Sequence, residues 1–289
     1  MSKIALGTAQ FGLDYGINNT SGEISQNQVN KILDYAIQND IDILDTAYNY
    51  GKSEEKIGKY LKFSNNLQKL KIISKLPGNG ANEPINYFDQ SLQRLNQKRL
   101  YGYMVHGFDS IIANPSLYNF FVDLKKSGRV QKIGISLYYP KEIDWILDKK
   151  MGFDFFQMPY NIFDHRFEPY FLKLKKLGKH VYIRSVFLQG LVFKNPNTLD
   201  KQFDKIRNKL IKLRKLADEL STSVQAFCLH FALMNKNISK IIIGIDNIDN
   251  LKDIINISKQ KIGLSDSLTN LSYLSEKDEN IILPFNWKL

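Results

Sequence analysis

Short apolar runs alternate along the chain with longer segments in which apolar residues recur every three or four positions. The short runs are typical of buried strands, and the longer segments are typical of helices with one face on a core. The predicted strands are residues 3–6, 41–45, 71–75, 101–105, 130–135, 153–157, 180–184 and 238–243. A helical pattern follows each of them, so the chain contains eight strand–helix units.

Start and stop signals limit several of the predicted helices. Ser25 and Gln28 have the spacing of a capping box before the first helix. Asn114 and Pro115 predict the start of another helix, and Gly128 its end. Further helices are expected at residues 53–61, 85–95, 141–147, 165–177, 204–220, 222–234 and 249–257.

Eight alternating strand–helix units favour a single (β/α)8 TIM barrel, because strands joined by helices form a parallel sheet and eight of them close it. A doubly wound Rossmann sheet is the competing fold. It needs the turn Gly-x-Gly-x-x-Gly after the first strand, where GTAQFG stands at positions 7–12 instead. The pair Gly78 and Gly80 lacks the third glycine and is interpreted as a loop. We expect one domain over residues 1–289, with the barrel at about 3–258 and an irregular tail at 259–289.

The composition is that of an ordinary globular protein, with 43% apolar and 24% charged residues among 289. Cys228 is the single cysteine, so no disulfide forms within the chain, which fits a reducing compartment. No apolar run has the roughly 18 residues of a membrane span, and no signal peptide is visible. We therefore expect a cytoplasmic protein with no membrane partner.

The net charge of +11 is the unusual global property. It is compatible with nucleic acid, a membrane surface or a phosphorylated small molecule as partner. The lysines are scattered, however, and no basic stripe interleaved with aromatic residues supports nucleic-acid binding. We expect a solvated lysine-rich surface with a small-molecule phosphate site and no nucleic-acid partner.

Polar residues follow the apolar strands at the positions where a barrel carries its chemistry, the carboxyl ends of the strands. In strand order these are Asp45, Lys75, His106, Ser136, Gln157 and Arg184 with Ser185, and Gly244 follows the eighth strand. Tyr50 lies in the loop after Asp45. Taken singly, such residues are more often a helix cap, a packed ring, a solvated amine or a structural imidazole. Their joint occurrence at neighbouring strand ends indicates a site.

Four of these residues form a chemically coherent set. The ammonium of Lys75 would lower the pKa of Tyr50, and Asp45 would pair with Lys75. His106 would donate a hydrogen bond to a substrate carbonyl. Together they suit the protonation of a developing alkoxide as a hydride arrives from elsewhere. The four histidines are far apart in the sequence, so no metal site is expected.

The stretch DTAYNYGKSEE at positions 45–55 strongly resembles the aldo-keto reductase superfamily. Matching pieces extend over residues 3–258: LGT at 6–8, ISK at 73–75, VH at 105–106, QMPYN at 157–161 and IIIG at 241–244. The stretch RSVFLQG at 184–190 is most similar to bacterial members found near surface-polysaccharide genes. The resemblance implies reduction of an aldehyde or ketone to an alcohol with NADPH, with a sugar or sugar derivative as the suggested substrate.

The resemblance also implies a role for each matching residue. Tyr50 matches the general acid, Lys75 the residue that lowers its pKa, Asp45 the partner of that lysine and His106 the residue that orients the carbonyl. The implied cofactor contacts are Ser136 and Gln157 at the carboxamide, Arg184 beside the nicotinamide, Ser185 and Phe187 at the pyrophosphate, and Gly244 to Asn250 at the adenosine, and Gly7 and Thr8 are further expected cofactor contacts. Phe11, Tyr48 and Phe108 are expected to wall the substrate pocket.

Departures from the family pattern concern mainly the adenosine site. Asn250 stands where Arg or Gln is common, Ile254 where Asn is common, and Leu137 where Asn often follows the serine. The adenosine 2′-phosphate thus lacks its usual arginine unless Lys252 replaces it. NADPH remains the expected cofactor and NADH stays open. A nicotinamide-loaded barrel that regulates a partner without turnover is the alternative function, and a monomer is the expected state.

Overall fold

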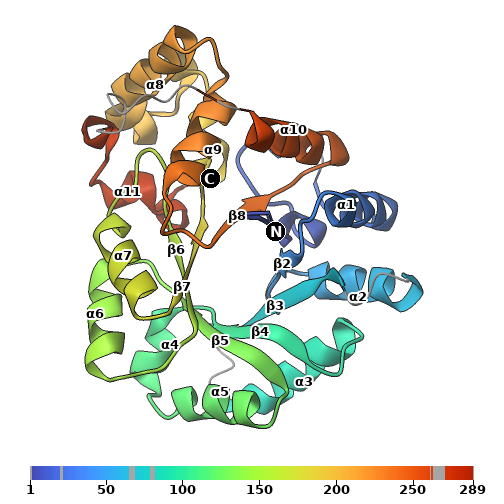
Figure 1. Cartoon of the computed structure of the whole chain (residues 1–289). Coiled ribbons are helices and arrows are strands. Elements are labelled where there is room, and N and C mark those ends of the chain that lie inside the picture. Colours follow the sequence, from blue (N-terminus) through green and yellow to red (C-terminus); the bar gives the residue numbers. More distant parts are fainter. Residues whose placement is uncertain are drawn as a thin grey trace.

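Eight parallel strands close into a barrel in chain order, as the pattern predicted (Figure 1). The structure is a computed structural model and describes residues 2–19, 22–64, 69–78, 82–260, 262 and 271–288. The strands are β1 (Ile4–Gly7), β2 (Ile43–Asp45), β3 (Lys71–Leu76), β4 (Leu100–Val105), β5 (Val130–Ser136), β6 (Phe155–Pro159), β7 (His180–Arg184) and β8 (Lys240–Gly244).

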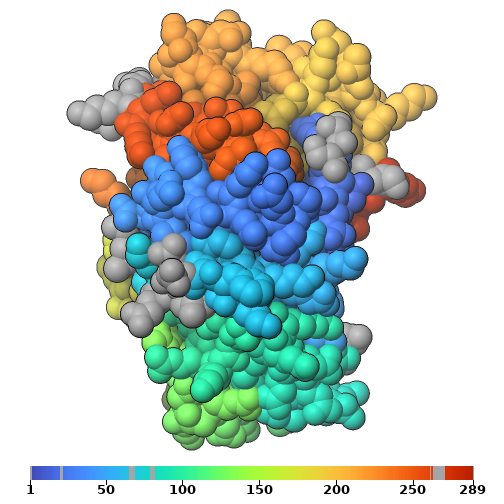
Figure 2. All heavy atoms as spheres, turned by 90° about the vertical axis from the view of Figure 1, so that its right-hand side faces the viewer, coloured from blue at the N-terminus to red at the C-terminus, as the bar shows by residue number. Residues whose placement is uncertain are grey.

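The barrel is closed by β1, which pairs with β2 on one side and with β8 on the other. Gly7 at the end of β1 is in register with both Asp45 and Gly244. Figure 2 shows the N-terminal segment in blue directly beneath the orange C-terminal helices, and the cyan and green segments follow below it. Because the parallel sheet closes, the polar ends of strands that are far apart in the sequence lie at one rim of the barrel.

Side chains alternate between the inside of the barrel and the helical layer, as expected for strands with a period of two. The interior cluster consists of Ala5, Ile43, Ile73, Met104, Phe155, Tyr182 and Ile242, one residue from nearly every strand. A Cβ at Gly134 would lie 2.4 Å from the ring of Phe155, so this glycine provides the space that the ring occupies. The barrel is a packed core below the rim.

Helices cover the outside of the barrel and bury their apolar faces on it (Figure 1). The N-terminus of the first helix follows its sequence signal, since the Ser25 hydroxyl accepts a hydrogen bond from the Gln28 amide. No helix of the described residues is long and apolar enough to cross a membrane. The helices are α1 (Gln26–Gln38), α2 (Ser53–Phe63), α3 (Pro84–Arg94), α4 (Phe108–Ala113), α5 (Leu117–Lys126), α6 (Pro140–Asp148), α7 (Glu168–Lys176), α8 (Arg207–Glu219), α9 (Val224–Met234), α10 (Ile248–Lys259) and α11 (Glu279–Ile282).

Several predicted helix starts, at 115, 165, 204 and 222, are two or three residues too early. Asn114 ends the short helix α4, and α5 begins only at Leu117, after a turn in which the Ser116 hydroxyl donates to Asn114. The helix predicted from residue 165 begins at Glu168. The carboxylate of Asp164 binds both the backbone and the guanidinium of Arg166, and these bonds hold the preceding residues in a turn.

The tail is more ordered than expected over the part that the structure describes. It contains α11 and two short 3-10 helices, Ser272–Leu274 and Pro284–Asn286. The Trp287 indole donates to the Ile281 carbonyl and contacts the ring of Phe203 edge-on. Residues 263–270 of the predicted tail, and Asn79 and Gly80 of the predicted loop, lie outside the described residues.

A substitution at Gly58 can test how closely the helices of the outer layer pack. Gly58 lies in α2, where a Cβ would be 1.9 Å from the carbonyl oxygen of Arg94 at the end of α3. Helix propensity alone favours alanine over glycine by about 1 kcal/mol. We expect the clash to reverse this preference, so that Gly58→Ala lowers the free energy of unfolding by about 1–3 kcal/mol. Urea denaturation measures the change.

The matched control for this prediction is Gly107→Ala. Nothing lies within 4 Å of a Cβ at Gly107, and its backbone is extended. We expect it to change the unfolding free energy by less than about 1 kcal/mol. A Gly58→Ala variant as stable as the wild type would contradict the proposed contact between α2 and α3.

Candidate active site

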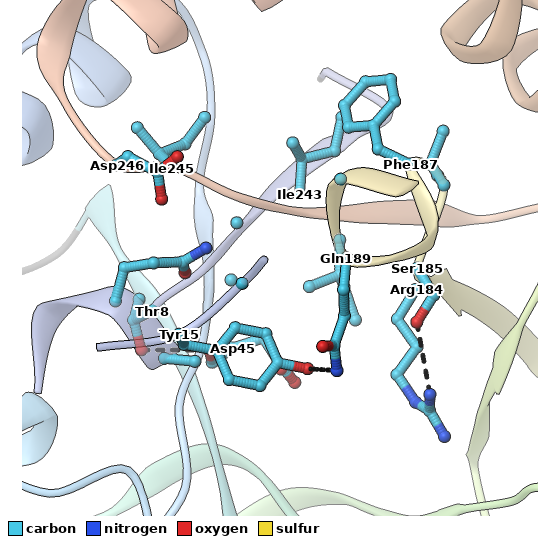
Figure 3. Close-up of a pocket in the computed structure, with 18 of the residues that line it drawn as sticks. Thr8, Tyr15, Asp45, Arg184, Ser185, Phe187, Gln189, Ile243, Ile245 and Asp246 are labelled. Carbon is cyan, nitrogen blue, oxygen red and sulfur yellow. Dashed lines mark hydrogen bonds between the residues drawn. The ribbon is translucent and has the colours of Figure 1, made fainter. Parts of the chain in front are cut away.

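A cavity of about 460 Å³ opens at the carboxyl ends of the strands, a size typical of small-molecule sites. Loops after β1, β2, β4, β5, β7 and β8 contribute to it, and Figure 3 shows some of the residues that line it. Twelve of the thirteen expected catalytic and cofactor residues lie on its wall: Gly7, Thr8, Asp45, Tyr50, His106, Ser136, Gln157, Arg184, Ser185, Phe187, Gly244 and Asn250. The thirteenth, Lys75, is completely buried behind them.

Lys75 is held by three acceptors. Its Nζ donates to Asp45 Oδ2 at 2.7 Å, to the Thr46 carbonyl at 2.8 Å and to the Tyr50 hydroxyl at 3.3 Å. An ammonium has three protons, so these contacts use all of its donors. The position and charge of Lys75 are thereby set by β2 and the loop that follows it.

Asp45 is held through both carboxylate oxygens. Oδ2 binds Lys75, and Oδ1 accepts a hydrogen bond of 2.8 Å from the Gln157 amide nitrogen. The amide nitrogen of Gln157 is therefore engaged by Asp45, which leaves its carbonyl oxygen for the cavity. One carboxylate links the ends of β2, β3 and β6.

The pKa of Tyr50 is raised overall, although Lys75 acts to lower it as expected. Burial is the largest cause and raises the pKa, Lys75 and Arg184 act to lower it, and Asp45 adds to the increase. Lys75 acts in the predicted direction, but burial outweighs it. For Lys75 itself, burial disfavours the charge, yet Asp45 and Tyr50 raise its pKa overall, so the ammonium persists.

His106 is a neutral imidazole at ordinary pH. Burial lowers its pKa to about 3, and the charges of Lys75 and Arg184 add to this effect. Its ring lies edge-on to that of Tyr50, with 5.8 Å between the centroids. A neutral imidazole still carries one N–H, so His106 can donate a hydrogen bond to a ligand beside Tyr50.

A second polar layer under the rim was missed by the sequence analysis. The Ser53 hydroxyl lies within hydrogen-bond distance of both Thr8 and Thr46, and Glu54 accepts from Ser74 at 2.6 Å. These residues belong to the stretch at 45–55, but their buried partners come from β1 and β3. The bonds tie the loop that carries Tyr50 to the neighbouring strands.

The loop after β7 and the loop after β1 meet across the cavity mouth. Gln189 donates to the Tyr15 hydroxyl at 2.7 Å, as Figure 3 shows, and its carbonyl accepts from the Ile17 amide. Asn18 donates to the carbonyl of Gly190. No local sequence pattern indicates Tyr15, because its partner is more than 170 positions away.

None of the three residues expected to wall the substrate pocket, Phe11, Tyr48 and Phe108, lines the cavity. Phe11 is fully buried in the core and does not reach the cavity, which corrects that prediction. The Tyr48 hydroxyl donates to Gln90 and lines a separate shallow depression over α3. Phe108 contacts Trp145 edge-on. The aromatic residues that do line the cavity are Tyr15, Tyr50, Tyr138, Phe187 and Phe193, together with His106.

The far end of the cavity is formed by residues after β8. A Cβ at Gly244 would lie 2.5 Å from the Gln10 side chain, so the glycine leaves room for this amide. Gln10 Oε1 is buried without a hydrogen-bond partner. Lys252 pairs with Asp249 on the exposed side of α10 and is not among the residues that line the cavity. A half-buried carboxylate, Asp246, lies there instead (Figure 3).

These features fit a nicotinamide dinucleotide. The cavity extends from the Tyr50 end to the segment after β8, and glycines and hydroxyl groups line it between the two ends. An unpartnered buried amide oxygen at Gln10 is suited to a ligand hydrogen bond.

The sequence model of the Aldo/keto reductase family matches residues 3–268, and the chain belongs to this family. "Uncharacterized oxidoreductase YqkF" of Bacillus subtilis (strain 168) is 25% identical over 282 residues, which cover 88% of this chain and 90% of that protein. Norsolorinic acid reductase B of Aspergillus parasiticus is 29% identical over 154 residues, 47% of this chain and 40% of that protein.

Solved structures confirm the fold. The aldo-keto reductase AKR11C1 from Bacillus halodurans (holo form) has a TM-score of 0.75, with 22% identity over 95% of this chain and 92% of that chain. The family and the oxidoreductase relatives make this chain an oxidoreductase that reduces carbonyl compounds with a nicotinamide cofactor.

The lowered pKa of His106 predicts a specific acid sensitivity. Between about pH 4 and pH 6 the unfolded chain binds a proton at this residue and the folded chain does not, so stability falls as pH falls. One such proton contributes about 1.4 kcal/mol per pH unit. We expect His106→Gln to reduce the pH slope of the unfolding free energy by up to about this amount. Parallel slopes for variant and wild type would show that His106 titrates normally when folded.

Proposed function

We propose that Tyr50 is the general acid that protonates the carbonyl oxygen during reduction of an aldehyde or ketone. The observation that carries this proposal is the Tyr50 hydroxyl on the cavity wall with the Lys75 ammonium 3.3 Å behind it. The phenol faces the ligand space, and the cation lies on the buried side. The substrate we propose is a small polar carbonyl compound such as a sugar derivative, because Tyr15, Gln189 and Asn18 add hydroxyl and amide groups to this wall.

In the proposed reaction the carbonyl oxygen lies between Tyr50 and His106, where both can donate hydrogen bonds to it. A reduced nicotinamide supplies the hydride that the carbonyl carbon accepts. The C=O π electrons move to the oxygen as the new C–H bond forms, and the Tyr50 proton is transferred to that oxygen. The product is the alcohol, and Tyr50 is left as a phenolate beside Lys75.

The raised pKa of Tyr50 suits this role. Burial keeps the proton on the phenol until a more basic alkoxide develops. Lys75 then stabilises the phenolate, because its ammonium nitrogen lies 3.3 Å from the Tyr50 oxygen and electrostatic interactions are strong in a buried site. Asp45 keeps the ammonium in place, so no reorganisation is needed during the proton transfer.

For the cofactor we propose that Ser136 and Gln157 hold the carboxamide and that Ser185, Phe187, Gly7 and Thr8 lie along the dinucleotide. Asp45 already binds the Gln157 nitrogen, so the Gln157 oxygen would accept from the carboxamide nitrogen. The adenosine would occupy the end formed by Gly244, Asp246 and Asn250.

Asp246 favours NADH over NADPH in this proposal. A carboxylate beside the adenosine ribose accepts a hydrogen bond from a 2′-hydroxyl and repels a 2′-phosphate. Burial raises the pKa of Asp246, and a hydrogen bond from Gln10 opposes this effect. Within the described residues Asp246 has no ion-pair partner, and Lys252 is engaged by Asp249. We therefore propose NADH as the cofactor, in place of the NADPH that the family resemblance implies.

Tyr50→Phe tests the general acid. We expect kcat for an aldehyde to fall by about 10²- to 10⁴-fold, while the cofactor Kd changes little. Tyr273→Phe removes a hydroxyl from an exposed ring in the tail and is the matched control, with unchanged turnover expected. Tight cofactor binding with a wild-type rate no higher than that of Tyr50→Phe would instead support the non-catalytic regulatory barrel.

Asp246→Asn tests the cofactor preference by fluorescence titration with NADH and NADPH. We expect the wild type to bind NADH more tightly than NADPH. The variant should bind NADPH about tenfold more tightly than the wild type does, which corresponds to about 1.4 kcal/mol. Asp249→Asn removes the same charge from an exposed position on α10 and is the control. Tighter NADPH binding by the wild type, or equal shifts in both variants, would argue against a role for Asp246.

A further inference from the structure

Arg184 is a cation on the wall of the catalytic cavity that lacks an anionic partner. Its guanidinium donates to the Leu137 carbonyl at 3.2 Å and lies 3.4 Å from the Ser185 hydroxyl. One face covers the ring of Tyr138, with 4.3 Å from the guanidinium carbon to the ring centroid. Through the described part of the chain, no carboxylate forms an ion pair with it.

Of the other six arginines, Arg99 is exposed to solvent. Four form ion pairs with carboxylates, and a fifth donates to two backbone carbonyls outside the cavity. These are Arg94 with Glu54, Arg129 with Asp89, Arg166 with Asp164, Arg207 with Asp204, and Arg214 with the carbonyls of Leu210 and Lys194. Arg184 differs from these five because it lines the cavity and keeps its charge uncompensated.

The charge of Arg184 acts on the space where the carbonyl would bind. It acts to lower the pKa of Tyr50, of His106 and of Tyr15, three groups on different loops around the cavity, although burial raises the pKa of both tyrosines overall. Asp45 is the carboxylate nearest to the catalytic groups, and it already binds Lys75. These two charges cancel, so the catalytic end has a net charge of +1 from Arg184.

We propose that Arg184 binds an anionic group, a phosphate or a carboxylate, carried by the carbonyl substrate itself. A guanidinium has five donors in a rigid planar fork that matches such groups. Tyr138 covers one face and Leu137 accepts from one end, so the remaining N–H groups are held in a fixed direction. The substrate is therefore an aldehyde or ketone with an anionic group a few bonds from the carbonyl.

The inference rests on the proposed carbonyl reduction and limits the substrate of that reaction to a carbonyl compound with an anionic group. Figure 3 shows Arg184 and Asp246 on opposite sides of the cavity. The cation is beside Tyr50 and the anion is beside the proposed adenosine end. The main alternative is that Arg184 binds the phosphates of the dinucleotide, which the experiment must separate from substrate binding.

The kinetic test compares D-glyceraldehyde 3-phosphate with D-glyceraldehyde, and 4-oxobutanoate with butanal. We expect the wild type to have a kcat/KM at least about tenfold higher for the anionic member of each pair. Arg184→Met should lower this preference by about 10- to 100-fold, which is the range for charge-assisted hydrogen bonds. Arg184→Lys should keep part of it, because the charge stays and the fork is lost. Lys212→Met, an equal charge change on the exposed face of α8, should keep all of it.

A binding test is independent of turnover and of how well Arg184→Met folds. Calorimetry measures the affinity of glycerol 3-phosphate for the protein saturated with NADH, which cannot oxidise this alcohol, in the wild type and in both Arg184 variants, and NADH titration gives the cofactor Kd. We expect the phosphate affinity to decrease in the order wild type, Arg184→Lys, Arg184→Met. A loss confined to the cofactor Kd would assign Arg184 to the dinucleotide and overturn the inference.

The outcomes distinguish this inference from the proposed function. Turnover of glyceraldehyde and butanal with no preference for their anionic counterparts overturns the role of Arg184 and leaves carbonyl reduction standing. Absence of turnover with Arg184-dependent binding of glycerol 3-phosphate supports the anion site and contradicts the proposed reaction. Absence of both turnover and binding overturns both proposals.

Discussion

The buried ion pair between Lys75 and Asp45 is the constraint on which the site depends. Desolvation of two charges is costly, and such a pair is tolerated only when further hydrogen bonds satisfy it. Here Thr46, Tyr50 and Gln157 supply them. Because these partners come from the loop after β2 and from β6, the electrostatic requirement of one ammonium holds this part of the rim together at the position where Tyr50 lines the cavity.

Closure of the sheet is what brings these groups together. Asp45, Lys75 and Gln157 end three separate strands, and they meet only because β1 pairs with both β2 and β8. The rigid interior below them, with Phe155 filling the space over Gly134, leaves the strand ends little freedom. The proposed catalytic groups are thus preorganised by packing, and the loops after β1 and β7 add an outer wall through Tyr15 and Gln189.

The charges in the cavity are distributed asymmetrically. This asymmetry is a better guide to the ligand than a polyanion partner inferred from the net charge of +11. Within the described residues Arg184 is a cation without an ion-pair partner at the Tyr50 end, and Asp246 is a carboxylate at the other end. Many surface lysines pair locally with carboxylates, as Lys252 does with Asp249. The charges that matter for ligand recognition are therefore a few unpaired groups inside the cavity, and the total charge reflects chiefly the solvated surface.

The order of elements, the barrel class and the polar strand ends followed from the sequence, because periodicity and strand-end position are local properties of the chain. The stretch at 45–55 indicated the family for the same reason. Tertiary structure alone decided that burial raises the pKa of Tyr50, that Phe11 is in the core, and that Tyr15 meets Gln189. Helix starts such as that of α5 also escaped prediction, since alternative caps compete locally. Desolvation, packing and contacts between distant loops depend on the closed barrel, and no local pattern encodes them.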